Sequence, residues 1–101
     1  MPGLKRSYSL TKTAEDIIKT VCERYAVTHA ELQGSYRGRD IVFARHLAMY
    51  LLRKHTHLTL VAIARIMGRD DHTTVIHAMK AINNYLATNS FGRRDEILSF
   101  Y

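Results

Sequence analysis

The sequence predicts an all-α fold, a small bundle of about five helices that contains a helix-turn-helix. Apolar residues recur at helical spacing through most of the chain, and no segment alternates apolar and polar residues as a half-buried strand would. The single proline is Pro2, so no predicted helix is interrupted by that residue. With 101 residues, of which 47% are hydrophobic, the chain can bury one modest core.

Capping residues mark where the first two helices begin. Thr11 or Thr13 can cap a first helix over residues 12–25, whose first turn holds the acidic side chains that the helix dipole favours. Thr28 can cap a short second helix, with Glu31 at the third position to complete a capping box. Both helices are therefore predicted from their first turns as well as from their apolar spacing.

The remaining helices follow a basic loop at residues 34–39. Residues 40–54 are predicted to form a third helix, which is apolar on most sides and should be the most buried element. Thr59 can cap a fourth helix over residues 60–67, and a fifth helix follows over residues 72–87.

The two ends of the chain are set apart from this pattern. Residues 1–10 have no periodicity and predict a flexible leader, so the folded domain is expected over residues 11–88. Residues 89–101 form a weakly patterned tail that can fold back as a short helix, pair two chains as a homodimer, or dock on a protein partner. The apolar residues of this tail are Phe91, Ile97, Leu98, Phe100 and Tyr101.

The positive charge is concentrated in one part of the chain. The net charge is +6, and residues 34–69 carry seven basic side chains against one acidic side chain. The rest of the chain is therefore close to neutral. Such a local excess favours a polyanionic partner over a merely solvated charged face.

The sequence also indicates a compartment. Cys22 is the only cysteine, so the chain can form no internal disulfide, as is typical of a reducing cytoplasm. We find neither the pattern of a secretory signal peptide nor an apolar run long enough to span a membrane. A cytoplasmic protein with no membrane partner is the expectation.

The start of the fifth helix is the most informative segment. The fourth helix, a turn around Gly68 and the fifth helix have helix-turn-helix spacing, which many small bundles share. Asp71, His72 and Thr73 are short side chains with hydrogen-bonding tips, and they precede the apolar face that begins at Val75. A helix that serves only the core needs a single N-cap there, whereas these side chains can reach base edges in the DNA major groove.

Residues 11–88 resemble the C-terminal DNA-binding domain of the DnaA family of bacterial replication initiators. The resemblance rests on residues 71–78 (DHTTVIHA), on residues 59–64 (TLVAIA) and on the basic loop before the long helix. It implies sequence-specific binding of double-stranded DNA, in a nucleoid-associated protein that acts as a transcriptional regulator or modulates replication initiation at DnaA-box-like sites.

The resemblance also implies two groups of contact residues. Asp71, His72 and Thr73 would contact base edges in the major groove, and Arg37 would enter the adjacent minor groove. Leu60 and Val61 would bind phosphate through their main-chain N–H groups. The expected contacts with the DNA backbone are Arg39, Arg45, His46, Arg53, Leu60, Val61, Arg69 and Thr74.

Two residues inside the motif depart from the family pattern. Asp70 stands where the family has an arginine, and Arg69 stands where a second glycine is usual. Asp70 would repel phosphate, and Arg69 can compensate from the next position. The target sequence and the affinity can therefore differ from those of the family's nine-base-pair box.

Other classes of function find little support. The family's ATPase domain lies upstream of this module, and the chain has no phosphate-binding loop, so we expect a stand-alone binding domain with no nucleotide partner. His55 and His57 have no cysteine or carboxylate partner nearby, and His72 and His77 are five residues apart, so they diverge by more than a quarter-turn on a helix. No nucleophile sits in a catalytic motif. We expect no cofactor, no metal and no enzyme. The rival interpretation is a protein-interaction module that has lost DNA readout, supported by Asp70 and the apolar tail.

Overall fold

The computed structural model describes residues 13–101, so the leader predicted over residues 1–10 and the candidate cap Thr11 lie outside the described residues. The described part is all-α, as predicted, and contains no strand. None of its helices combines the length and the apolar content needed to cross a membrane. The elements are α2 (Ala14–Tyr25), α3 (His29–Gln33), α4 (Arg39–His55), α5 (Leu60–Ile66), α6 (Thr73–Thr88), the 3₁₀ helix η2 (Ser90–Gly92) and α7 (Arg94–Leu98).

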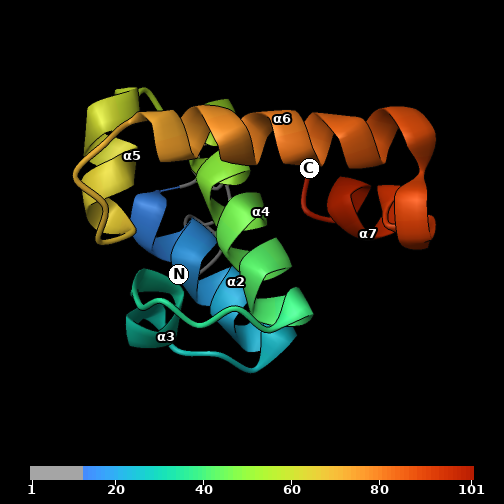
Figure 1. The fold of residues 1–101 in the computed structure, drawn as a ribbon, viewed down its shortest axis with the longest axis horizontal. Coiled ribbons are helices and arrows are strands. Elements are labelled where there is room, and N and C mark those ends of the chain that lie inside the picture. Colours follow the sequence, from blue (N-terminus) through green and yellow to red (C-terminus); the bar gives the residue numbers. More distant parts are fainter. Residues whose placement is uncertain (1–12) are drawn as a thin grey trace, which may run out of the picture.

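The central element is α4, as its apolar pattern predicts. Nine of its 17 residues are buried, and it packs against α2, α3, α5 and α6. In Figure 1, α6 lies along the long axis of the molecule and crosses α4, with α5 near its first turn and α7 near its last. Leu47 and Leu52 of α4 are fully buried, and each such side chain contributes about 1.5–3 kcal/mol of hydrophobic stabilisation. The helices α2, α3, α5 and α6 are therefore arranged around α4.

Threonine side chains cap α2, α3 and α5, as the sequence predicts. Thr13 and Thr59 each accept a hydrogen bond from the backbone N–H three residues further on. Thr28 and Glu31 form the reciprocal capping box, with N···O distances of 3.0 Å to the threonine hydroxyl and 2.8 Å to the carboxylate. These bonds satisfy amides that a helix start otherwise leaves without partners.

The turn between α5 and α6 is a glycine-terminated helix end. Gly68 has φ +71°, in the left-handed region that favours glycine, and its N–H donates to the Arg65 carbonyl at 2.9 Å. The N–H of Arg69 donates to the Ala64 carbonyl at 2.8 Å, which completes a Schellman motif. A Cβ atom at Gly68 would lie 3.1 Å from Gln33 of α3, so the turn passes close to that helix.

The C-terminal residues fold back onto the bundle. Ile97 of α7 is fully buried, and Phe100 is 5% exposed. Arg93, just before α7, places its guanidinium carbon 3.9 Å from the centre of the Phe43 ring and pairs with Asp40 at 3.2 Å. The tail therefore contributes part of the core and is tied to the first turn of α4.

Candidate nucleic-acid interface

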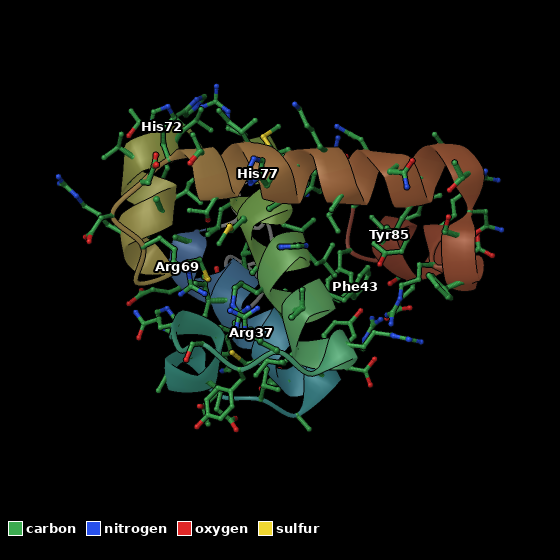
Figure 2. All side chains as sticks on the ribbon, viewed as in Figure 1. Arg37, Phe43, Arg69, His72, His77 and Tyr85 are labelled. Atoms are coloured by element: carbon green, nitrogen blue, oxygen red, sulfur yellow. The ribbon has the colours of Figure 1, made fainter. Side chains whose placement is uncertain are left out.

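Three polar side chains are exposed to solvent where α6 begins. The side chains of Asp71 and His72 are 67% and 48% exposed, and Thr73 is also exposed. Figure 2 shows His72 at the end of α6 that meets the α5–α6 turn. An Asp71 oxygen accepts a hydrogen bond from the Thr73 N–H at 3.0 Å, and this bond lowers the pKa of the Asp71 carboxyl. The structure thus brings the three predicted base-contacting residues of this helix together.

His77 extends the same exposed face of α6 by one helical turn. It lies four residues after Thr73, so the two side chains share a face of the helix. His77 is exposed and lies close enough to His46 of α4 to influence its protonation. The sequence predicts no DNA contact for His77, although its spacing of four residues from Thr73 places both side chains on one face of a helix.

Arg37 lies in the loop between α3 and α4, apart from the α6 cluster (Figure 2). It is exposed, and no hydrogen bond or ion pair holds its guanidinium within residues 13–101. Arg39 begins α4, and its guanidinium carbon lies 5.4 Å from the centre of the Phe91 ring. The loop therefore offers one unengaged arginine and one that stacks on an aromatic ring.

A groove of about 550 Å³ lies between this loop, α4 and α6. Arg37, Arg39 and His46 supply its polar lining. Its apolar lining comes from Val42, Phe43, Ala81 and Tyr85. Burial lowers the pKa of His46, and the nearby charges of Arg45 and His77 lower it further. At neutral pH the His46 imidazole is therefore neutral, so it can exchange hydrogen bonds but adds no fixed charge.

Arg45 points into the protein. Arg45 is buried, with only 7% of the residue exposed. Its Nε donates to the Leu32 carbonyl at 2.7 Å, and its Nη2 donates to the Tyr36 carbonyl at 3.1 Å. Burial lowers the pKa of Arg45, and the neighbouring charge of Arg69 adds to this effect. The residue braces the segment that leads to Arg37.

Arg69 is also engaged by main-chain carbonyls. Its Nη1 donates to the Gln33 carbonyl at 2.6 Å and to the Met67 carbonyl at 2.9 Å. Its Nη2 donates to the Gly34 carbonyl at 3.0 Å. The guanidinium that the sequence assigns to phosphate thus connects the α5–α6 turn to the end of α3.

Two further predicted backbone contacts lie on either side of α5. Thr74 is half-buried, and its hydroxyl lies 3.7 Å from the Met49 sulfur of α4. Arg53 is exposed near the end of α4 and donates to the Leu58 carbonyl at 3.1 Å. Arg53 therefore remains accessible, whereas the hydroxyl of Thr74 faces the core.

Leu60 and Val61 are the first two residues of α5. Their N–H groups belong to the set at a helix start that has no partner within the helix. Val61 is 41% exposed and Leu60 is half-buried. This placement agrees with a role for their main-chain N–H groups rather than their side chains.

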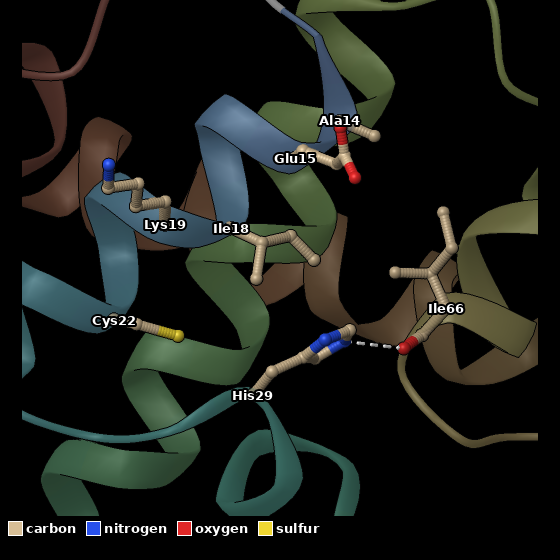
Figure 3. Close-up of a pocket in the computed structure, with 7 residues that line it drawn as sticks. All are labelled: Ala14, Glu15, Ile18, Lys19, Cys22, His29 and Ile66. Carbon is tan, nitrogen blue, oxygen red and sulfur yellow. Dashed lines mark hydrogen bonds between the residues drawn. The ribbon is translucent and has the colours of Figure 1, made fainter.

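A second pocket lies away from these residues, between α2, α3 and the end of α5 (Figure 3). Its volume is about 420 Å³, and Ile18, Cys22 and Ile66 are among its lining residues. Burial raises the pKa of the Cys22 thiol, which keeps that group protonated at neutral pH. Within residues 13–101, no three side chains of His, Cys, Asp or Glu gather as metal ligands would.

A family model and individual relatives both relate this chain to DnaA proteins. Residues 14–82 match the family model described as bacterial dnaA protein helix-turn-helix. The chromosomal replication initiator protein DnaA of Thermomicrobium roseum is 41% identical over 83 residues, which are 82% of this chain and 18% of that protein. The DnaA protein of Microcystis aeruginosa is 42% identical over 74 residues, 73% of this chain and 17% of that protein. The chain thus spans less than a fifth of the length of either relative.

Proposed function

This chain belongs to the family of bacterial DnaA helix-turn-helix domains, and we propose that it binds double-stranded DNA in a sequence-specific manner. The observation that carries the proposal is the exposed polar start of α6, where Asp71, His72 and Thr73 precede the buried residue Val75. A recognition helix enters the major groove with its N-terminal residues against base edges. Binding, rather than catalysis, is therefore the proposed activity.

The three side chains of α6 offer complementary chemistry to base edges. The Asp71 carboxylate can accept from cytosine N4, and the Thr73 methyl group can pack against the thymine methyl group. The His72 imidazole can donate to or accept from a purine edge. Together they discriminate between base pairs, because each pair presents a distinct pattern in the major groove.

Arg37 is proposed to enter the minor groove beside the base pairs that α6 contacts. Its side chain is exposed, and no hydrogen bond or ion pair with another residue of the described range 13–101 would have to break for it to enter the DNA. A narrow A·T-rich minor groove concentrates negative potential and attracts arginine. The groove between the loop and α6, with Arg39 and His46 in its lining, suits the phosphate strand that separates the two DNA grooves.

The remaining contacts are proposed to fix the position of the domain on the duplex. Arg53 would bind phosphate through its charge, and Leu60 and Val61 through their N–H groups. Thr74 would reach phosphate only if its hydroxyl turned away from Met49. Arg45 and Arg69 have their guanidiniums on carbonyl oxygens, so we leave them out of the phosphate contacts.

The proposed biological role is to modulate replication initiation at DnaA-box-like sites. Its support is the similarity to proteins named as chromosomal replication initiators. A role in transcriptional regulation would use the same surface, and the selected DNA sequence distinguishes the two. A site close to the family's box favours replication control, whereas an unrelated site favours a separate regulator.

Selection of bound duplexes from a random-sequence pool tests the proposal directly. We expect one preferred sequence, bound more weakly as salt increases because phosphate contacts release counterions. Thr73→Ala or His72→Ala should reduce discrimination between duplexes more than overall affinity, whereas Arg53→Ala should weaken all duplexes alike. Failure to prefer any duplex over random DNA would refute sequence-specific binding.

A second candidate is docking on a protein partner or a second copy through the C-terminal tail. The observation in its favour is the exposure of Phe91 at 76%, Leu98 at 43% and Tyr101 at 47%. Ile97 and Phe100, which the sequence counts in the same apolar tail, are buried in the chain's own core and leave less surface for a partner. Sedimentation equilibrium of the intact chain and of Phe91→Ser tests self-association through this surface.

A further inference from the structure

We propose that Arg69 is a positioning residue that fixes the Arg37 loop relative to the first turn of α6. The inference rests on the proposed DNA-binding function, because it explains how two separate reading surfaces stay in register on one duplex. Asp71, His72 and Thr73 lie two to four residues after Arg69 in the chain, whereas Arg37 lies 32 residues before it. A connection across that gap has to be made in space.

The guanidinium of Arg69 makes this connection. Within the turn, its Nη1 donates to the Met67 carbonyl at 2.9 Å. The same side chain spans to α3, with distances of 2.6 Å to the Gln33 carbonyl and 3.0 Å to the Gly34 carbonyl. Gly34 stands three residues before Arg37, so the bond to its carbonyl fixes the base of the Arg37 loop.

The carbonyl groups at this point need such a donor. The last carbonyls of a helix have no partner within the helix and carry the negative end of its dipole. Arg45 donates to the Leu32 and Tyr36 carbonyls, on either side of the two that Arg69 holds. Four carbonyls between residues 32 and 36 are thus held by two guanidiniums. A planar guanidinium can donate to two carbonyls at once, whereas a lysine ammonium has no such fork.

Further hydrogen bonds and a close backbone contact also hold α3 against the turn. The Ile66 carbonyl lies 2.9 Å from His29 Nε2, shown as a dashed line in Figure 3, and accepts a second bond at 2.9 Å from Gln33 Nε2. The backbone of Gly68 passes so close to Gln33 that an added Cβ would lie 3.1 Å away. These contacts hold α3 against the turn, and Arg69 extends the joint into the loop.

A direct phosphate contact is the alternative role for Arg69, and the two roles predict different behaviour. A phosphate contact is a charge effect that lysine preserves in large part and that affects every duplex alike. A positioning role depends on the fork, so lysine fails to replace arginine. It also acts only through Arg37, so its loss removes the selectivity that Arg37 provides.

The first experiment uses the free protein and needs no DNA. We would measure backbone ¹⁵N order parameters of residues 35–38 in the wild type, Arg69→Ala and Arg69→Lys. Both variants should show lower order parameters in this loop, with unchanged values in α4 and α6. Arg65→Ala and Arg65→Lys alter an exposed arginine of neighbouring α5 and serve as matched controls that should leave the loop unchanged. Loop values equal to wild type in both Arg69 variants would overturn the proposal.

The second experiment is a double-mutant cycle with Arg37→Ala, read on the duplex selected from the random pool. In the wild type, Arg37→Ala should lower discrimination against minor-groove base changes. In the Arg69→Lys background the same substitution should have little further effect, a coupling of about fivefold or more. Independent effects, or full rescue by lysine with equal weakening on all duplexes, would instead assign Arg69 to phosphate.

The two failures remain distinguishable. If the random pool yields no preferred duplex, the proposed function fails, while the order parameters still decide whether Arg69 holds the loop. If a duplex is selected but Arg37 and Arg69 act independently on discrimination, the proposed function stands and the positioning role fails.

Discussion

The two ends of α6 differ in how their polar groups are satisfied. At the N-terminal end, the cap residue His72 makes no capping bond with its side chain, and Asp71 and Thr73 are exposed. At the C-terminal end, Asn89 takes a left-handed conformation with φ +53°, and its N–H donates to the Tyr85 carbonyl at 2.7 Å. At that end, main-chain and side-chain groups of the tail donate hydrogen bonds to the last carbonyls of α6.

Arg94 adds further hydrogen bonds at the C-terminal end of α6. Its Nε donates to the Leu86 carbonyl at 2.8 Å, and its main-chain N–H donates to the Asn89 side chain at 3.0 Å. At the N-terminal end the partners are local instead, because the Thr73 N–H donates to the Asp71 carboxylate at 3.0 Å and the Val75 N–H donates to the His72 carbonyl at 3.0 Å. One end of the helix is thus bonded to the C-terminal tail, and the other leaves the polar side chains of Asp71, His72 and Thr73 exposed. Substitutions at the two ends should therefore have separable effects.

The largest expected effect comes from the closed end. Ile97→Ala removes a fully buried side chain of α7, and large-to-small substitutions of this kind cost about 2–5 kcal/mol in free energy of unfolding. Urea unfolding followed by circular dichroism measures the loss. Leu98→Ala, at a neighbouring residue that is 43% exposed, should change stability by only about 0.5 kcal/mol. Equal losses for the two variants would show that α7 is not packed as described.

The open end should give the reverse result. Thr73→Ala should leave the free energy of unfolding within about 0.5 kcal/mol of wild type, since Thr73 is exposed. On the selected duplex it should reduce discrimination at one base pair by about 1–3 kcal/mol. Competition binding against single-base variants of the duplex measures this effect. A Thr73→Ala protein as unstable as Ile97→Ala would contradict the separation of the two ends.

A smaller effect is expected at Asp70, which is exposed just before the reading residues. Asp70→Asn removes a negative charge that repels phosphate, so affinity for every duplex should rise by a few-fold at low salt. The gain should shrink as salt increases, because added ions screen exposed charges beyond about 8–10 Å. Asp95→Asn, an exposed carboxylate in the first turn of α7, is the matched control and should leave DNA affinity unchanged.

The smallest expected effect is a titration at Asp71. The Thr73 N–H holds the pKa of the Asp71 carboxyl in the folded state below its ordinary value of 3.8. The bond therefore supports the fold fully above pH 3.8, and its contribution is lost as the pH falls through the lowered folded-state pKa. NMR titration of the carboxyl carbon measures this value. A measured value at or above 3.8 would contradict the bond from the Thr73 N–H.

The helices were predictable because their signals are local. Thr28 and Glu31 identify a helix start from side chains three residues apart, and the structure contains that capping box. Helix ends shift by a residue or two, as at α4, which begins at Arg39 because Gly38 is its cap. The exposed position of Asp71 and His72 followed from the same local pattern, since short polar side chains precede the apolar face.

The carbonyl partners of Arg45 and Arg69 could not be identified from the sequence. Arg45 and Arg69 belong to a basic segment that predicts phosphate contacts, and their charge looks the same as that of Arg37. Their acceptors are main-chain carbonyls, at sequence separations of 13 residues for Leu32 and 36 residues for Gln33. Every residue has a carbonyl, so no pattern of residue types marks the one that a distant arginine will meet.

The sequence could not decide whether the C-terminal tail packs on its own domain, again because the deciding contacts are distant in the chain. Ile97 and Phe100 are apolar in the sequence, but apolar residues suit a core, a dimer or a partner equally well. Their direction is decided by contacts such as that of Arg93 with the face of Phe43, 3.9 Å from the ring centre. This pairing joins residues that are 50 positions apart, beyond the reach of periodicity.

The central place of α4 has a consequence for how the domain folds. Because α4 packs against α2, α3, α5 and α6, its unfolding would remove core contacts from each of those helices. We therefore expect a single cooperative transition, in which amides of α4 exchange with solvent only through global opening. A peptide of residues 60–88 alone would carry the three residues proposed to contact bases, but it would lack the packing that keeps α6 helical. We therefore expect that α6 grafted onto another protein needs α4 beside it to stay folded.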